Sequence, residues 1–175
     1  SSVERFEKAV KESIENIRRL LEELEREIRE SMKHLRELVK ELKEALDRIV
    51  ERLRRTVRDE DELRELIKEL EDIVRRAEEK LERYRKRLED LIDEARRTVE
   101  DVERRHREKI EEVRRRNRVE EEDLKRLDKE NKDIEKKIRD LVKEARDENR
   151  KLKRDIERTL RELEERLKEV EDRET

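Results

Sequence analysis

Apolar residues recur at intervals of 18 residues through most of this chain, and no other feature of the sequence constrains its fold as strongly. The repeat is visible in three series: Phe6, Leu24 and Leu42; Leu63, Leu81 and Val99; and Leu124, Val142 and Leu160. Eighteen residues in five turns give 3.6 residues per turn, the period of an undistorted α-helix. A repeat of 3.5 would impose a left-handed supercoil and one of 3.67 a right-handed supercoil. The pattern therefore predicts long amphipathic helices that are nearly untwisted.

Two interruptions divide the apolar pattern into three segments. Residues 58–62 contain no apolar side chain, and Val119 is the only apolar residue between Val113 and Leu124. The angular position of the apolar stripe changes at each interruption, which it would not do along one continuous straight helix. Basic residues end the segment before each interruption and acidic residues open the segment after it, as the helix dipole favours. The sequence therefore predicts helices at about residues 2–57, 60–116 and 120–172.

The two links between these segments carry residues suited to helix ends. Asp59, with Glu62 three residues later, predicts a capping box at the start of the second helix. Asn117 is the residue best suited to a left-handed cap at the end of that helix. Both links are too short to run the length of helices of about 80 Å, so successive helices must be antiparallel. The predicted fold class is therefore all-α, a long antiparallel up-down-up three-helix bundle that forms a single domain over residues 1–175.

Composition limits both the fold and the function. The chain has no Gly and no Pro, which argues against sheets and tight hairpins, and no Cys, which excludes disulfides and thiolate zinc sites. Charged residues make up 62% of it, but 53 basic and 56 acidic side chains nearly balance and are interspersed. Such a surface is not expected to bind nucleic acid, which needs a basic face. No apolar run approaches the ~20 residues that span a bilayer, so we expect no membrane association.

Polar residues interrupt the apolar stripe at matching heights in the three predicted helices. With turns near residues 59 and 118, antiparallel geometry places residue 13 opposite about residue 105, and residue 106 opposite about residue 130. Ser13, His106 and Asn131 are therefore expected to share one height in the bundle. A buried polar side chain without a partner costs several kcal/mol. We therefore expect these three side chains to hydrogen-bond as a buried set.

One repeat away, a second buried polar set is expected from Ser31, Tyr84 and Asn149, with His34 facing Tyr84. The third repeat position is apolar, with Ile49, Leu70 and Leu167. Both polar layers would penalise axial slips and exchanged topologies, because a slip sets Asn against Leu. The alternative is that some of these side chains lie at the edge of the stripe, and His34 is the nearest to that edge.

Few residues suggest chemistry. Glu103 and His106 match the Glu-x-x-His pattern of di-iron bundles, but the other histidine, His34, has Ser31 at the corresponding position, so no metal site is expected. The two histidines lie ~30 Å apart in height at helical rise, and no set of nucleophile, base and carboxylate is apparent. The sequence therefore predicts no catalytic residue and no cofactor.

His106 lies at the centre of the apolar face of its helix, and no inward carboxylate is apparent opposite it. Burial disfavours a charged imidazolium, so the sequence predicts that the protein loses some stability in acid. The unfolded chain would then bind more protons than the folded chain below about pH 6.5. Glu103, one turn away, is the residue that could offset this effect by pairing with the cation.

Taken together, these features resemble a de novo designed bundle of parametrically generated straight helices. The resemblance covers the whole chain and rests on helices free of Gly and Pro, the 18-residue repeat, the narrow charge alphabet and the layered Ser, His, Asn and Tyr positions. It implies a soluble, recombinantly produced scaffold with no natural biochemical activity, which is not an enzyme and requires no partner. The alternative is a helical interaction module that self-associates or completes its core with a partner. Both a monomer and a homo-oligomer are compatible with the pattern, and no cellular localisation is implied.

Overall fold

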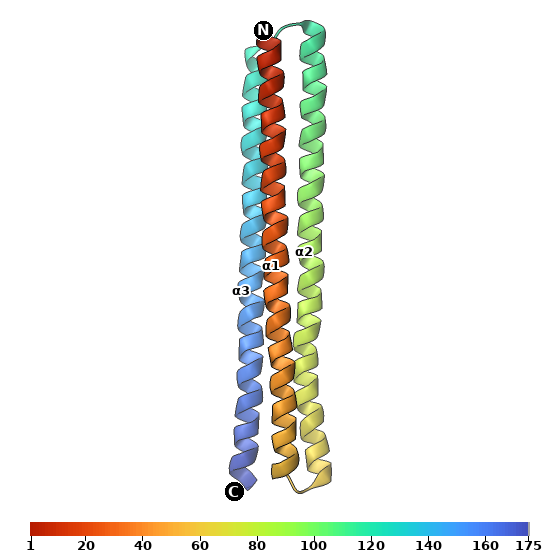
Figure 1. Cartoon of the computed structure of the whole chain (residues 1–175), viewed down its shortest axis with the longest axis vertical. Helices are drawn as coiled ribbons and strands as arrows, with labels where there is room; N and C mark the ends of the chain where they lie inside the picture. The colour runs from red at the N-terminus through yellow and green to blue at the C-terminus, as the bar shows by residue number, and fades with distance from the viewer. Residues whose placement is uncertain (175) are drawn as a thin grey trace. The chain divides into compact units, whose positions relative to one another are not determined.

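The computed structural model describes residues 1–174 of the chain, and within them three long helices account for almost every residue (Figure 1). They are α1 (Ser2–Thr56), α2 (Glu60–Arg116) and α3 (Glu121–Glu174). The chain is 95% helical, the described residues form no strand, and all three helices pack against one another. The all-α three-helix bundle is therefore confirmed, with helix ends within two residues of the predicted ones.

The start of α2 is fixed by Asp59. Its carboxylate oxygen Oδ1 accepts hydrogen bonds from the backbone N–H groups of Asp61, at 2.9 Å, and of Glu62, at 3.3 Å. These donors have no partner within the helix, so the cap stabilises the first turn. The Glu62 carboxylate accepts instead from Nη2 of Arg173 at 3.2 Å. Asp59 therefore acts as the predicted N-cap, while Glu62 bonds to α3.

The end of α2 is fixed by Asn117. Its backbone φ is +52°, in the left-handed region, and its N–H donates to the carbonyl of Arg114 at 3.1 Å. Asn is the residue other than Gly that adopts this conformation most readily. The predicted left-handed cap is therefore confirmed in a chain that has no Gly.

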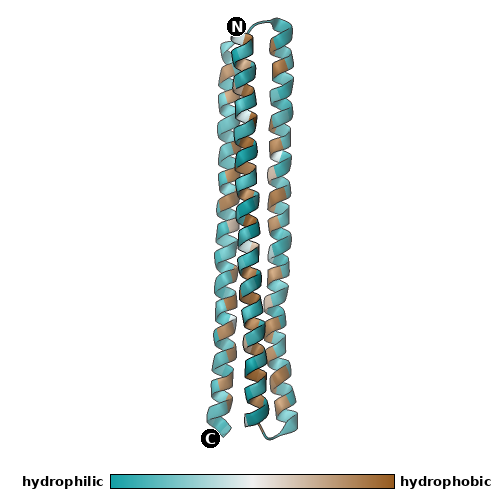
Figure 2. Cartoon of the chain, in the orientation of Figure 1, coloured by the Kyte–Doolittle hydropathy of each residue, from teal (hydrophilic) through white to brown (hydrophobic). Residues whose placement is uncertain are grey.

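The chain packs as two compact units, each with segments of all three helices. The first unit comprises Ser1–Arg29 and Leu88–Arg146; the second comprises Glu30–Arg87 and Asp147–Thr175, described as far as residue 174. Figure 2 shows the apolar residues recurring along each helix among hydrophilic ones. The largest fully buried apolar side chains are Val10, Ile17, Leu24, Ile134 and Ile138 in the first unit, which also contains Leu88, and Leu35, Leu42, Leu53, Leu70 and Leu163 in the second. Each contributes about 1.5–3 kcal/mol by its burial.

Ion pairs within each unit define the directions of the helices. In the first unit, Nε of Arg114 lies 2.5 Å from Oε1 of Glu7, and Nε of Arg18 lies 2.6 Å from Oε1 of Glu103. Residue numbers rise along α1 as they fall along α2, so these two helices are antiparallel. In the second unit, Lys80 pairs with Asp155 at 3.6 Å and Arg166 with Glu69 at 3.4 Å, which makes α2 and α3 antiparallel. The predicted up-down-up order is therefore confirmed.

One large apolar residue of the predicted stripe is exposed. The side chain of Leu124 is 51% exposed, whereas Asp123 beside it is 3% exposed. Asp123 faces inward because it binds the first turn of α3 and two cations of α2, as described below. The expectation that Leu124 is a core residue is therefore wrong. At this position Asp123 faces inward to cap α3, and Leu124 faces solvent.

Candidate functional site

The three polar residues predicted at one height form a hydrogen-bonded set in the first unit, here called the polar layer: Ser13 of α1, His106 of α2 and Asn131 of α3. The Ser13 hydroxyl donates to Oδ1 of Asn131 in a short hydrogen bond. Nε2 of His106 lies 3.2 Å from Oδ1 of Asn131 and 3.5 Å from Oγ of Ser13. His106 is 2% exposed and Ser13 7% exposed. Asn131 is half-buried. A residue from each helix thus contributes to one largely buried polar contact set.

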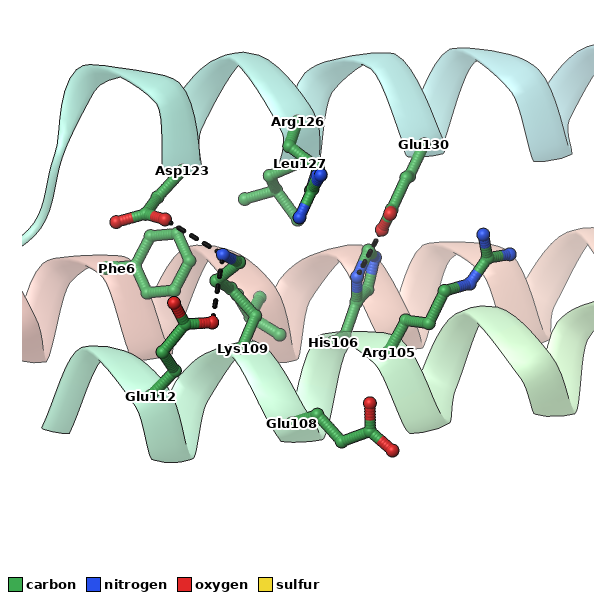
Figure 3. A pocket seen from close by; sticks show the side chains of 11 residues that line it. Phe6, Arg105, His106, Glu108, Lys109, Glu112, Asp123, Arg126, Leu127 and Glu130 are labelled. Atoms are coloured by element: carbon green, nitrogen blue, oxygen red, sulfur yellow. Dashed lines mark hydrogen bonds and ion pairs between the residues drawn. The ribbon is translucent and has the colours of Figure 1, made fainter. Parts of the chain in front are cut away.

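A fourth residue, Glu130, completes the surroundings of the imidazole. Its Oε2 lies 3.3 Å from Nδ1 of His106, and its side chain is 19% exposed (Figure 3). The expectation that no inward carboxylate faces His106 is therefore wrong, and the predicted loss of stability in acid loses its premise. Antiparallel geometry, with a turn near residue 118, already predicts that residue 130 lies opposite residue 106. The apolar pattern does not identify Glu130, because this residue lies beside the stripe and only its long side chain reaches the ring.

Glu103, the residue expected to offset the charge of His106, binds elsewhere. Its two carboxylate oxygens accept from Nε and Nη2 of Arg18 at 2.6 and 3.1 Å, and Arg107 lies 3.5 Å from it. Glu103 is only 8% exposed, so this bidentate pair joins α1 to α2 at the edge of the core. Among residues 1–174, no group of three or more His, Cys, Asp or Glu side chains is placed to hold a metal ion.

Towards the α2–α3 link, the buried carboxylate of Asp123 gathers three donors. It accepts from the backbone N–H of Glu120 at 2.9 Å and from Nη2 of Arg116 at 2.9 and 3.1 Å, and Nζ of Lys109 lies 3.1 Å away. Burial alone would raise the pKa of Asp123, but these three donors lower it below its usual value. Lys109 also pairs with Glu112 at 3.1 Å, and despite burial the two carboxylates raise the pKa of Lys109.

A pocket of 340 Å³ lies beside this group of residues in the first unit. Its floor includes Phe6 and Leu127, and its polar wall includes His106, Lys109 and Glu130 (Figure 3). Lys109 extends between Asp123 and Glu112, while Glu130 reaches across from α3 to the imidazole. The polar groups at this wall are thus engaged with one another, and the imidazole forms the boundary between the pocket and the polar layer.

Ser13, His106 and Glu130 stand in the order of a nucleophile, a base and an orienting carboxylate. No such set is apparent in the sequence, because Glu130 lies beside the apolar stripe and not within it. However, the Ser13 hydroxyl directs its proton to Asn131, and Ser13 does not line the pocket. The arrangement therefore connects three helices through hydrogen bonds but does not present the serine oxygen to a substrate in the pocket.

The second predicted polar set is less complete. Tyr84 is buried, 5% exposed, whereas Ser31 and Asn149 are half-buried. Oδ1 of Asn149 is buried and accepts no hydrogen bond, so neither Ser31 nor Tyr84 donates to it. Burial, and then the negative charge of Glu148, raise the pKa of the Tyr84 hydroxyl. These residues do not reproduce the closed set formed by Ser13, His106 and Asn131.

His34 is exposed, so its assignment to a buried layer is wrong. It lies at the rim of the α1 stripe, between the buried residues Met32 and Leu35 in the sequence, and its side chain is exposed to solvent. The alternative interpretation, that some of the polar side chains are at the edge of the stripe, is correct for this residue.

Comparisons with protein-family models, with curated proteins and with solved structures give no match to this chain. No helix in the described part of the chain has a stretch both long and apolar enough to cross a membrane.

Proposed function

We propose that this protein is a structural scaffold, without substrate or cofactor, in which the polar layer fixes how the three helices align. The observation that carries the proposal is that Ser13, His106 and Asn131, from three different helices, satisfy one another in the core. At the third repeat position, Ile49, Leu70 and Leu167 are all buried and apolar. A shift that set the polar layer against such residues would leave buried polar atoms unpaired, at about 1–3 kcal/mol for each atom.

Two further observations support a scaffold of designed origin. The helices are free of Gly and Pro, and the 18-residue repeat persists along each of them, as in parametrically built bundles. The nucleophile-like serine is directed to an amide oxygen and does not line the pocket, which supports the view that the protein is not an enzyme.

The test replaces the whole layer by apolar residues of similar shape: Ser13→Ile, His106→Leu and Asn131→Leu in one variant. If the layer specifies alignment, the variant stays helical and stable but populates more than one arrangement. Its ¹H–¹⁵N spectrum should then show more backbone signals than the parent, or its mass in sedimentation should include multiples of 21.9 kDa. One set of signals and a single mass equal to the parent's would contradict the proposed role of the layer. A matched control changes Ile49 to Val in the apolar layer and should leave the number of signals unchanged.

A second candidate function, an interaction module, is favoured by the incomplete burial of several apolar residues on α1. Half-buried residues on this helix include Ile14, Leu20, Leu21, Leu38, Leu46 and Val50. Such residues could be covered by another copy or by a partner. Sedimentation equilibrium of the parent distinguishes the two functions, because a scaffold gives the monomer mass at every concentration and a self-associating module does not.

A further inference from the structure

The imidazole of His106 has a hydrogen-bond acceptor at each of its two ring nitrogens. Nδ1 faces the carboxylate of Glu130 at 3.3 Å, and Nε2 faces Oδ1 of Asn131 at 3.2 Å. The Ser13 hydroxyl cannot supply a proton to Nε2 in this arrangement, because it donates to the same Asn131 oxygen. A neutral imidazole has one N–H, whereas an imidazolium has two. With the Asn131 amide in this orientation, only an imidazolium can donate to both acceptors at once.

A neutral ring requires a different pattern, and the same four side chains can provide it. If the Asn131 amide is reversed, its NH₂ group takes the place of Oδ1 and can donate to the lone pair of Nε2 and to Oγ of Ser13. Nδ1–H continues to donate to Glu130. In each pattern both ring nitrogens of His106 face a group of the matching kind, as buried groups require. The two patterns differ by one proton and one amide reversal.

We propose that the polar layer is a proton-binding site in which release of the proton from Nε2 of His106 and reversal of the Asn131 amide occur together. The proton leaves to water, the N–H bond breaks, and its electron pair becomes the acceptor for the amide NH₂. The charge of the site changes from a neutral imidazolium–carboxylate pair to the single negative charge of Glu130. The inference rests on the geometry of the layer and does not depend on the proposed scaffold role.

The surroundings of the ring make Glu130 the charge that acts on it most directly. From α3, Arg126 and Asp123 also line the pocket, and from α2 the charged residues there are Arg105, Glu108, Lys109 and Glu112. Lys109 is held by Asp123 and Glu112. From α1, the pocket is lined by Phe6 and Val10, and the nearby Arg18 is bound to Glu103. The 340 Å³ pocket reaches the exposed residues Arg105 and Arg126, which gives water a route to the ring.

The experiment follows the imidazole and amide nitrogens of the uniformly ¹⁵N-labelled full chain across the pH range in which it stays folded. Long-range ¹H–¹⁵N spectra show which ring nitrogens carry protons, and side-chain NH₂ signals report on Asn131. His34, which is exposed, and Asn149, in the second unit, are internal references. We expect both nitrogens of His106 to carry protons at the acid end and Nε2 to lose its proton as the pH rises. The Asn131 NH₂ signals should move with the same midpoint, and those of Asn149 should not.

Three results would overturn the proposal. The first is a ring that keeps one protonation state over the whole folded range. The second is a neutral ring that carries its proton on Nε2. The third is an Asn131 side chain whose signals do not change while His106 titrates.

Two variants test the coupling independently. Asn131→Asp supplies acceptors that cannot be reversed into donors, so His106 should hold its proton to a pH higher by about one unit or more. Glu130→Gln removes the charge at Nδ1 and should move the midpoint in the opposite direction; its side chain is partly exposed, so the fold should tolerate the change. Asn149→Asp is the matched control and should leave the His106 midpoint unchanged. A midpoint in Asn131→Asp equal to that of the parent would contradict the amide reversal, and an unchanged midpoint in Glu130→Gln would remove Glu130 from the site.

Discussion

The two units place polar residues at equivalent repeat positions of α1 and α3, but only the first unit pairs them. Ser13 and Asn131 meet each other and His106, whereas Asn149, one repeat after Asn131, leaves its Oδ1 buried without a partner. The α2 residue one repeat before His106 is Leu88, so no imidazole is available at that repeat. Polar residues at matching heights are therefore not sufficient, since a closed set also needs a group with two polar atoms directed at different neighbours.

The two links between helices also differ, because one has a buried capping residue and the other an exposed one. In the first unit, Asp123 caps α3 from a buried position and binds Arg116 and Lys109. In the second unit, Asp59 caps α2 from an exposed position, with backbone N–H groups as its donors. Removing a partner from a buried charge set leaves charges uncompensated, whereas removing an exposed cap costs only the cap. The first unit therefore has two sets of buried polar interactions, one around Asp123 at the α2–α3 link and one in the polar layer.

The largest expected effect is at these two links. Asp123→Ala should lower the free energy of unfolding by about 3 kcal/mol, because it removes the cap and leaves Lys109 and Arg116 without their shared partner. Asp59→Ala should cost about 1 kcal/mol, the usual value of an exposed N-cap. Urea unfolding followed by circular dichroism, with equal m-values, measures both. Equal losses in the two variants would show that burial of Asp123 adds nothing to its role as a cap.

The next effect compares the two asparagines. Asn131→Leu should destabilise by about 2 kcal/mol, because Ser13 and His106 lose their shared acceptor in the core. Asn149→Leu should instead be neutral or stabilise by up to about 1 kcal/mol, because it removes a buried oxygen that has no partner. Opposite signs in the same urea assay would establish the difference between the units. A loss of similar size in both variants would mean that Asn149 is paired in solution.

A smaller effect separates the members of the polar layer. His106→Leu alone should cost about 1 kcal/mol, because the Ser13–Asn131 bond survives while Asn131 and Glu130 lose the ring. Adding Ser13→Ile and Asn131→Leu should recover that loss, since an apolar layer of similar shape can equal a polar one. Chemical unfolding of the single and triple variants gives the comparison. A single variant more stable than the triple variant would rule out a shared layer.

The fold could be predicted from the sequence because it depends on many residues that repeat the same signal. The 18-residue period, the two interruptions and the charges beside them predict all three helices. Asn117 could be predicted as the left-handed cap because the chain has no glycine, which would otherwise be the preferred residue. The members of the polar layer were found because each lies well inside its stripe. Helical phase describes where a Cβ points and not how far a long side chain reaches or which residue caps a helix, so it does not reveal the contacts of Glu130 and Asp123. The same limit led to the misplacement of His34, whose position at the rim decides its exposure.

The smallest expected effect is a loss of stability at low pH, and it is expected at Asp123 in the first unit and not at Asp59 in the second. Burial would raise the pKa of Asp123, but the Glu120 N–H, Lys109 and Arg116 together lower it in the folded protein. The unfolded carboxyl group titrates near ~3.9. Just below that pH the unfolded chain therefore binds a proton that the folded chain does not. The stability contributed by Asp123 is thus fully present above pH ~3.9 and is lost as the pH falls through the lower folded pKa.

Asp123→Asn removes this titration while keeping the size of the side chain. The difference in unfolding free energy between the parent and Asp123→Asn should therefore be constant above pH ~3.9 and should shrink below it. Urea unfolding at a series of acid pH values measures it, with Asp59→Asn run in parallel to represent the exposed cap of the second unit. A difference that stays constant down to the acid end would mean that Asp123 gains no stability from being ionised. In that case the contrast between the two links would rest on packing and not on charge.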